Sequence, residues 1–364
     1  MDVLYRKETR LKNSSYYDNP VYINTKRFLF EFLRRTGLCA VFRYLHRNSV
    51  LVLAYHDILP QGFPENNVLF GMTVNTEEFE WQLNHIKANY NPISLGQLSA
   101  WLAGESFLPP RPVLLTFDDG HNNNLHHALP ALRKRQMPAA CFVVAGNLGS
   151  RHLTWVEDGY DRLMSSAGKE WVTLTGERHV LGTRTEQFAA CSRFFRLFQT
   201  LSEEEQDQEM ENLRSQLPLE DDGARFPTRF EFLAATELRI LCENNVEIGA
   251  HTMTHPILST LKSQTAQSEI VGSKLRLEEA AGKSVTAFAY PFGMPGADFT
   301  ERDKDFVREA GFSLAFSGVT GFISRDKDRF SLPRIGVGRM SRAHFVATIT
   351  GTLDALKHVA GKVT

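Results

Sequence analysis

The sequence lacks features that would mark two common classes of protein. Its 364 residues include only four cysteines, at positions 39, 141, 191 and 242, and none of these forms a CxxC pair. Scattered thiols of this kind favour a reducing compartment over a disulfide framework. Positive charge is not in excess either, since the formal net charge is -1, whereas a nucleic-acid-binding domain normally carries a basic surplus. We therefore expect no nucleic-acid partner.

Long hydrophobic runs are also missing. No apolar run reaches about 18 residues, the length that suggests a membrane-spanning helix, and the first 20 residues show no signal-peptide pattern. These absences predict a soluble, cytoplasmic protein. Residues 25–47 nevertheless repeat apolar side chains at helical spacing, with lysines and arginines between them. A helix of this kind can rest on a membrane surface, although packing against the main domain is the commoner arrangement.

Strand-like and helical segments alternate along most of the chain. Short apolar runs predict buried strands at residues 49–56, 112–117, 139–144, 246–250, 285–290 and 313–316. Helical patterns fill the intervals at 76–90, 94–104, 122–136, 230–243, 264–281 and 300–310. Such alternation predicts an α/β fold with a parallel sheet, closed or nearly closed as a barrel.

Three segments do not follow this alternation. Residues 150–230 are charged and mostly helical in pattern, which predicts a largely helical insertion. We expect an N-terminal arm with the amphipathic helix at 1–48, the main domain at 49–350 and a C-terminal tail at 351–364.

The first polar motif, Thr-Phe-Asp-Asp-Gly at 116–120, stands where a strand is expected to end. Active sites of parallel α/β folds gather at that edge of the sheet. The adjacent carboxylates of Asp118 and Asp119 repel each other unless a cation or an asymmetric pair of pKa values relieves them. Taken alone, however, Asp-Asp-Gly is usually only a turn.

A second motif, at 249–256, places His251 and His255 four positions apart after another strand. Two neutral imidazoles and one carboxylate make a facial set of metal ligands with open positions. A lone pair of histidines is more often incidental, but its setting matches that of Asp-Asp-Gly and favours a metal site. The third motif, Phe-Ala-Tyr-Pro-Phe-Gly at 288–293, predicts a rigid turn whose N–H groups can face a ligand, or merely a turn that closes a strand.

Together the three motifs resemble the polysaccharide deacetylases of carbohydrate esterase family 4, the NodB-homology domain, over residues 50–340. The resemblance implies a distorted (β/α) barrel of about seven parallel strands. It implies that Asp118 is the general base and that the backbone N–H of Phe292 is the oxyanion donor. The implied ligands of a divalent metal, which we expect to be Zn²⁺, are Asp119, His251 and His255.

Two departures from the family leave the general acid open. Many members carry an arginine in the third motif that orients the catalytic aspartate, and this chain has Ala289 there. The family's late Leu-x-His, which supplies the acid, is absent, so His56 and Arg334 are candidates to protonate the leaving amine. The pair Tyr55-His56 resembles a branch that deacetylates exopolysaccharides such as β-1,6-linked N-acetylglucosamine. Candidate substrate contacts are Tyr55, Tyr290, Pro291 and Arg334.

The resulting hypothesis is a metal-dependent hydrolase that removes N-acetyl groups from an amino-sugar polysaccharide or a glycan precursor. Its expected partner is an N-acetylated amino-sugar polymer or oligosaccharide. One alternative is a hydrolase of another small-molecule C–N amide, which fits the missing late histidine. Another is a catalytically silent glycan-binding homologue. The presence of both aspartates and both histidines speaks against the silent homologue, because a binding module does not need two adjacent carboxylates.

Overall fold

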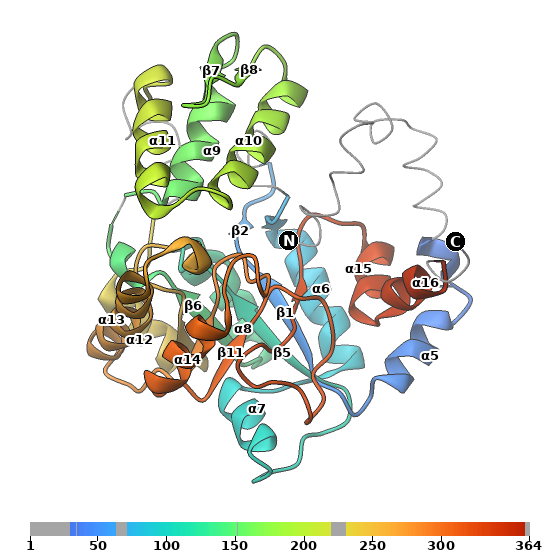
Figure 1. Cartoon of the computed structure of the whole chain (residues 1–364). Helices are drawn as coiled ribbons and strands as arrows, with labels where there is room; N and C mark the ends of the chain where they lie inside the picture. Colours follow the sequence, from blue (N-terminus) through green and yellow to red (C-terminus); the bar gives the residue numbers. More distant parts are fainter. Residues whose placement is uncertain (1–29, 34, 63–70, 151, 220–230, 361–364) are drawn as a thin grey trace.

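The computed structural model describes residues 30–33, 35–62, 71–150, 152–219 and 231–360. Its main sheet contains seven parallel strands and one short strand beside them (Figure 1). The strands are β1 (Leu51–Tyr55), β4 (Asn91–Pro92), β5 (Pro112–Phe117), β6 (Ala139–Val143), β9 (Val246–Ala250), β10 (Ala287–Ala289), β11 (Leu314–Phe316) and β12 (Ile335–Gly336). The order across the sheet is β11-β10-β9-β6-β5-β1-β12, and β4 pairs with β5.

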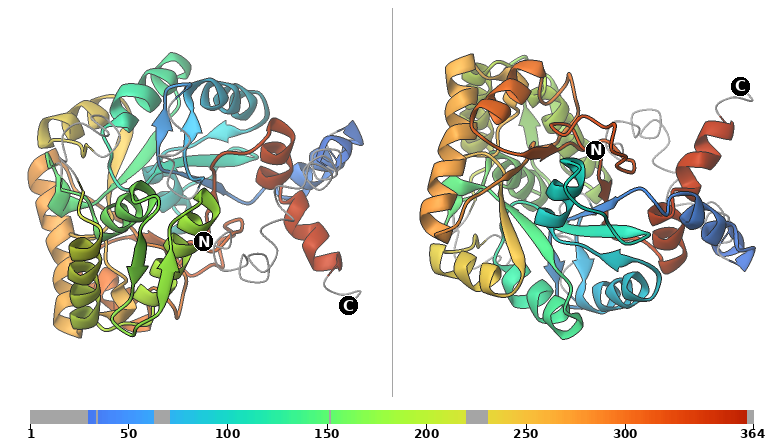
Figure 2. Two further views of the ribbon diagram at one scale, coloured as in Figure 1. Left: turned by 90° about the horizontal axis from the view of Figure 1, so that it is seen from above. Right: turned by 90° about the horizontal axis from the view of Figure 1, so that it is seen from below.

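The two edges of this sheet curl toward each other. Phe316 of β11 forms a parallel bridge with Leu332, three residues before β12, and the N–H of Ser317 donates to the carbonyl of Leu332 at 2.8 Å. The view along the sheet in Figure 2 shows the strands ringed by helices. The predicted distorted (β/α) barrel of about seven parallel strands is confirmed.

The strands are buried on both faces, which explains their continuous apolar runs. In β5, Leu114 belongs to the core inside the barrel, whereas Val113 and Leu115 belong to the core under the helices. The helices over the sheet are α6 (Thr76–Asn89), α8 (Leu129–Arg135), α12 (Ala235–Glu243), α13 (Ser263–Ala281), α14 (Glu301–Glu309) and α15 (Arg342–Ile349). Helix α7 (Leu95–Leu102) packs instead against the core inside the barrel. Shorter elements are β2 (Ile58–Leu59), β3 (Val74–Asn75), a π-helix η2 (Asn124–Ala128), and 3-10 turns η3 (Ala145–Asn147) and η4 (Leu258–Thr260).

The predicted insertion folds around a core of its own, above the barrel in Figure 1. Its elements are α9 (Trp155–Ser165), β7 (Glu170–Val172), β8 (Arg178–Val180), α10 (Arg184–Phe198) and α11 (Glu203–Gln216). The prediction that this region is largely helical agrees with these elements, and the β7–β8 hairpin was not foreseen. Residues 220–230, the end of the predicted insertion, lie outside the described part of the chain.

The two terminal helices stand to one side of the barrel in Figure 2 and contact each other. Helix α5 (Leu38–Leu45) follows Gly37, whose φ of 77° interrupts the helical pattern expected over residues 25–47. Residues 351–364 were expected to form a tail, but they contain α16 (Thr352–Ala360), because Leu353 and Leu356 pack against the core. Residues 1–29 of the predicted N-terminal arm and amphipathic helix lie outside the described residues. In the described ranges, no helix combines the length and apolar character needed to cross a bilayer.

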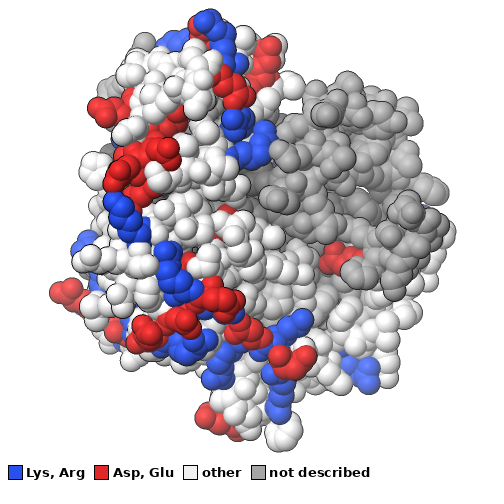
Figure 3. Space-filling view, viewed as in Figure 1, with Lys and Arg blue, Asp and Glu red and all other residues white. Residues whose placement is uncertain are grey.

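Surface charge is mixed on the face that Figure 3 presents. Lysine and arginine alternate there with aspartate and glutamate, and the described residues of this face gather no large patch of one sign. This distribution agrees with the formal net charge of -1.

Candidate active site

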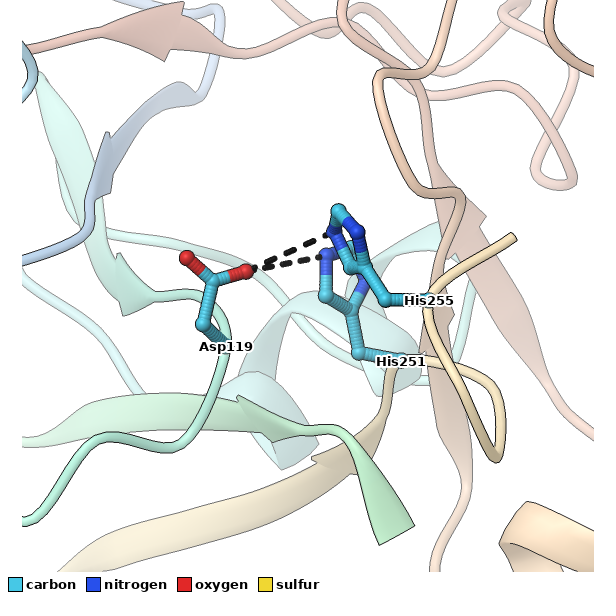
Figure 4. A group of neighbouring side chains, drawn as sticks. All are labelled: Asp119, His251 and His255. Carbon is cyan, nitrogen blue, oxygen red and sulfur yellow. Dashed lines mark ion pairs between the residues drawn. The ribbon is translucent and has the colours of Figure 1, made fainter. Parts of the chain in front are cut away.

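The three predicted metal ligands come together at the carboxyl ends of β5 and β9 (Figure 4). One ligating atom from each of Asp119, His251 and His255 lies within 4.8 Å of the others. The Oδ1 atom of Asp119 is 3.6 Å from Nε2 of His251 and 3.5 Å from Nε2 of His255. A carboxylate oxygen and two imidazole nitrogens facing one point are a donor set that suits a divalent ion such as Zn²⁺.

The protonation of the two imidazoles also suits a metal. Burial lowers the pKa of His251 and of His255, so both imidazoles are neutral at neutral pH. Burial raises the pKa of Asp119, and the charges of nearby histidines oppose the rise. The Nδ1 atom of His251 lies 2.7 Å from the carbonyl of Ala289, which leaves Nε2 directed at the site. This support of the distal ring nitrogen is typical of metal-binding histidines.

The backbone around the ligands is held in uncommon conformations. Among the described residues, four of the seven non-glycine residues with positive φ belong to this site: Asp119, Thr252, His255 and Phe292. Positive φ at such residues is unfavourable and persists where surrounding contacts impose it. Next to Asp119, Gly120 has a φ of 80°, and a Cβ there would lie 2.7 Å from Cγ1 of Val143. The Asp-Asp-Gly turn therefore requires its glycine.

The turn between the two histidines is tied to a helix of the barrel. The N–H groups of Met253 and Thr254 donate to Oε2 of Glu269 on α13, at 2.8 and 2.9 Å. The N–H of His255 donates to Oγ1 of Thr252 at 3.0 Å. These bonds fix the path of the chain from His251 to His255.

Asp118 is ion-paired inside the barrel with Arg334. Its Oδ1 and Oδ2 accept from Nη1 and Nη2 of the guanidinium at 2.7 and 2.8 Å, and both side chains are buried. Burial alone raises the pKa of Asp118, but the charge of Arg334, followed by those of His251 and His56, outweighs it and lowers the pKa to about 2. Asp118 is therefore ionised at neutral pH.

The third motif has no arginine to pair with Asp118, and Arg334, from a later part of the chain, pairs with it instead. It comes from the residue before β12, and its guanidinium lies over the rings of Phe142 and Phe316, with its carbon 5.6 and 5.7 Å from their centroids. The sequence predicted Arg334 as a substrate contact or a proton donor, whereas the structure engages it with Asp118. The only sequence signal for this pairing was the absence of an arginine at Ala289.

The Phe292 N–H, the predicted oxyanion donor, has no hydrogen-bond acceptor among the described residues. Phe292 has a φ of 59°, and its ring centroid lies 5.2 Å from that of His255. The preceding Pro291 is buried. The third motif thus forms the expected turn beside a predicted metal ligand, with an N–H available.

His56 lies after β1, close enough to Asp118, Asp119 and His255 for its charge to act on all three. Its Nδ1 is buried and has no hydrogen-bond partner in the described part of the chain. His56 is therefore at the site, as the sequence predicted.

The side chains of Tyr55 and Tyr290 lie outside this site. Tyr55 is fully buried and its hydroxyl donates to Gln82 at 3.1 Å. The hydroxyl of Tyr290 donates to the carbonyl of Phe330 at 3.1 Å, and its ring stacks on Phe299. The structure does not support the prediction that these two side chains contact substrate, because both belong to the core.

A buried network that the sequence did not predict lies beside the first motif. The Nδ1 atom of His121 lies 2.8 Å from Oδ1 of Asp57, and its Nε2 lies 2.6 Å from Oε1 of Glu157. Burial lowers the pKa of His121, but the carboxylates of Asp57 and Glu157 outweigh this and raise it well above its usual value. The only local signal was the position of His121, two residues after Asp119.

A barrel with an Asp-His-His group and an ion-paired aspartate at its strand ends defines a class of hydrolases that act on C–N amide bonds. The polysaccharide deacetylase model matches residues 107–313, more than half of the chain. The chain therefore belongs to the polysaccharide deacetylase family, whose members hydrolyse N-acetyl amide bonds.

Individual relatives are distant. The YxkH protein of Bacillus subtilis (strain 168) is 22% identical over 300 residues, which are 82% of this chain and 75% of that protein. A poly-beta-1,6-N-acetyl-D-glucosamine N-deacetylase of Staphylococcus aureus is 26% identical over 113 residues, only 29% of this chain and 39% of the relative.

Solved structures agree at the level of the fold. IcaB from Ammonifex degensii has a TM-score of 0.54 and 20% identity over 83% of this chain and 97% of its own. The deacetylase PplD of Streptococcus pyogenes, solved with acetate, has a TM-score of 0.54 and 18% identity over 83% of this chain and 98% of its own.

Proposed function

We propose that this protein is a metal-dependent deacetylase that removes N-acetyl groups from an amino-sugar polysaccharide or oligosaccharide. The observation that supports it most is the convergence of Asp119 with the neutral imidazoles of His251 and His255, beside the ionised Asp118. A binding module has no use for an aspartate held ionised next to three convergent ligands. The family supports hydrolysis, and the proposal adds the metal, the residue roles and the sugar.

Asp119, His251 and His255 would hold a divalent cation, which we propose to be Zn²⁺. Such an ion, when bound, polarises a carbonyl and makes a water molecule acidic. Asp118 would accept the proton of the water that attacks the acetyl carbon, because Arg334 keeps its carboxylate ionised and oriented. The N–H of Phe292 would donate to the developing oxyanion, a contribution of about 2.7–4 kcal/mol for one well-placed donor.

Departure of the sugar amine requires a proton, and we assign its delivery to His56. Arg334 was the other candidate, but its guanidinium is paired with Asp118 in the barrel interior. His56 lies at the site with a nitrogen that bonds to no described residue. In this assignment Asp118 takes a proton from water and His56 gives a proton to the amine, so protons are conserved in the reaction.

The polymer we propose to test first is β-1,6-linked N-acetylglucosamine. Its support is the partial similarity to the Staphylococcus aureus enzyme with that name, together with the fold shared with IcaB.

The direct test is release of free amine from β-1,6-linked N-acetylglucosamine oligomers. We expect turnover with purified protein, loss after a chelator, and recovery on adding one equivalent of Zn²⁺. A small cyclic amide serves as the comparison substrate, because the alternative hydrolase would prefer it. Binding of the oligomers with no amine release in the presence of Zn²⁺ would favour a silent homologue and contradict the proposal.

We also propose that the N-terminal helical segment makes peripheral contact with a membrane surface. Four large apolar side chains gather there with high exposure: Phe32 (54%), Val41 (53%), Tyr44 (62%) and Leu45 (62%). The opposite face of α5 packs inward through Cys39, the buried residue of this helix. The helix is thus apolar on both sides, so packing against the domain accounts for only one of them.

An arginine lies next to this exposed face. The Arg47 guanidinium carbon lies 4.1 Å from the ring centroid of Tyr44. Within the described part of the chain, Arg47 forms no ion pair with a carboxylate. An unpaired cation beside exposed apolar side chains suits anionic lipid headgroups.

Co-sedimentation with vesicles tests this contact. We expect the protein to bind phosphatidylglycerol-containing vesicles and not pure phosphatidylcholine, and the double variant Tyr44→Ser/Leu45→Ser to lose binding. Ile240→Ser on α12 is the control, because Ile240 is also exposed (42%) but belongs to another surface. Equal vesicle binding by the double variant would remove the membrane proposal.

A further inference from the structure

We propose that the first turn of α9 clamps the two ligand-bearing segments of the metal site, with Trp155 and Glu157 as positioning residues. The inference rests on the proposed metal site and gives the insertion a specific part in it. The two side chains lie two positions apart, and each reaches a different segment of the barrel.

Trp155 reaches the turn that carries the second histidine. Its Nε1 donates to the backbone carbonyl of His255 at 2.9 Å. The core of the insertion fixes the indole, since its ring stacks on Phe198 with centroids 4.6 Å apart and planes 8° apart. The ring also packs against Phe292, with centroids 5.6 Å apart. Trp155 therefore connects the insertion to two predicted active-site residues.

His255 needs such a support more than His251 does. His251 is held through its ring by the carbonyl of Ala289, whereas Nδ1 of His255 is buried and has no partner among the described residues. No hydrogen bond to a described residue fixes its ring, so its orientation depends on packing against Phe292 and on its backbone, which has an unfavourable φ of 64°. The bond from Trp155 to the His255 carbonyl acts on that backbone.

Glu157 reaches the segment that carries Asp119. Its Oε2 accepts from the N–H of Thr154 at 2.8 Å, which caps α9, and its Oε1 lies 2.6 Å from Nε2 of His121. His121 is two residues beyond Asp119 and is bonded on its other side to Asp57. Glu157 and His121 are both buried, with 2% and 1% of their surface exposed. One helical turn thus contacts both the carboxylate and the imidazole sides of the site.

The consequence is that the insertion sets the separation of Asp119 from His255. Neither Trp155 nor Glu157 is placed to touch the reacting atoms, so both would act through the residues they hold. Supports of metal ligands typically change metal affinity by about 10–100-fold when removed.

The test is zinc affinity of Trp155→Phe, measured by competition with a chromophoric chelator. Phenylalanine keeps an aromatic ring against Phe198 but cannot donate to His255. The matched control is Trp171→Phe, because Trp171 is buried in the same insertion and its Nε1 donates at 3.3 Å to Glu209, a residue of the insertion helix α11. We expect affinity to fall at least about tenfold in Trp155→Phe and to stay unchanged in Trp171→Phe.

A second variant and a second readout separate positioning from a general loss of stability. Glu157→Gln should also weaken zinc binding, and the visible absorption of bound Co²⁺ should change in Trp155→Phe and Glu157→Gln but not in Trp171→Phe. Wild-type affinity and spectrum in both clamp variants would overturn the clamp alone. Equal weakening in all three variants would also overturn it, because a structural effect would then suffice. A wild-type protein that binds no zinc would overturn the proposed function itself.

Discussion

The barrel and the insertion meet at one site but bury their side chains in different ways. Strands β1, β5, β6 and β9 are covered on both faces, so nearly every residue in them is apolar. In the insertion, α10 and α11 keep exposed faces whereas α9 is buried over most of its length, and the three helices pack around large rings such as Trp171 and Phe194. The polar residues at the strand ends supply the proposed ligands and base, and the insertion adds supports through Trp155 and Glu157 to those that the barrel provides itself. The proposed chemistry therefore belongs to the barrel, whereas positioning is shared between the two parts.

The largest loss of activity should follow a substitution at the barrel's strand ends. Asp118→Asn removes the proposed base and keeps the shape of the side chain, so turnover should fall by up to about 10⁴-fold, the upper range for a general base. Steady-state deacetylation measures this. Asp207→Asn, on the insertion helix α11, is the control, and it should leave turnover unchanged. Comparable activity in the two variants would remove Asp118 from its role.

A cavity made in the insertion core should destabilise the insertion more than the barrel. Phe194→Ala removes a fully buried ring from the insertion core, and such changes cost about 3–5 kcal/mol. We expect amide hydrogens of residues 155–217 to exchange faster, while β1, β5 and β6 stay protected. Phe142→Ala, inside the barrel, should instead loosen the barrel strands. Uniform loss of protection in Phe194→Ala would show that the two cores unfold as one.

His56→Gln tests the proposed proton donor. Amide hydrolysis should fall by about 10²-fold, the lower range for general acid catalysis. Hydrolysis of p-nitrophenyl acetate should change little, because p-nitrophenolate leaves without a proton. If both substrates slow equally, His56 does not act on the leaving group.

The smallest effect should be a shift in pH dependence. Arg334→Met removes the charge that lowers the pKa of Asp118, and burial then raises that pKa. A base must be ionised, so the acidic limb of kcat/KM should move to higher pH in Arg334→Met. Arg334→Lys keeps the charge and should show a smaller shift. An unmoved acidic limb in Arg334→Met would mean that another group controls it.

The sequence predicted correctly those elements whose structure depends on a local pattern of residues. The expected strand at 246–250 coincides with β9, and the expected helix at 264–281 begins one residue after α13 does. Both agree because the spacing of apolar residues along a segment reflects which of its faces is buried. The expected helix at 122–136 exists, but it opens as the π-helix η2 before α8. The spacing of His251 and His255 likewise placed them correctly beside Asp119.

Features that depend on contacts between distant segments could not be predicted from the sequence. Strand β12 has only two residues, Ile335 and Gly336, too few to show a period. Its docking beside β1 is what brings Arg334 to Asp118, so the pair could not be foreseen. The same holds for the bond from Trp155 to His255, which joins residues 100 positions apart.

The most direct test of the account is the zinc content of Asp118→Asn and His255→Ala, purified in parallel and analysed by elemental analysis. Both should be inactive, for different reasons. We predict about one zinc per chain in Asp118→Asn, whose ligands are intact, and none in His255→Ala, which lacks one of three protein ligands. Stoichiometric zinc in His255→Ala would contradict the proposed metal site.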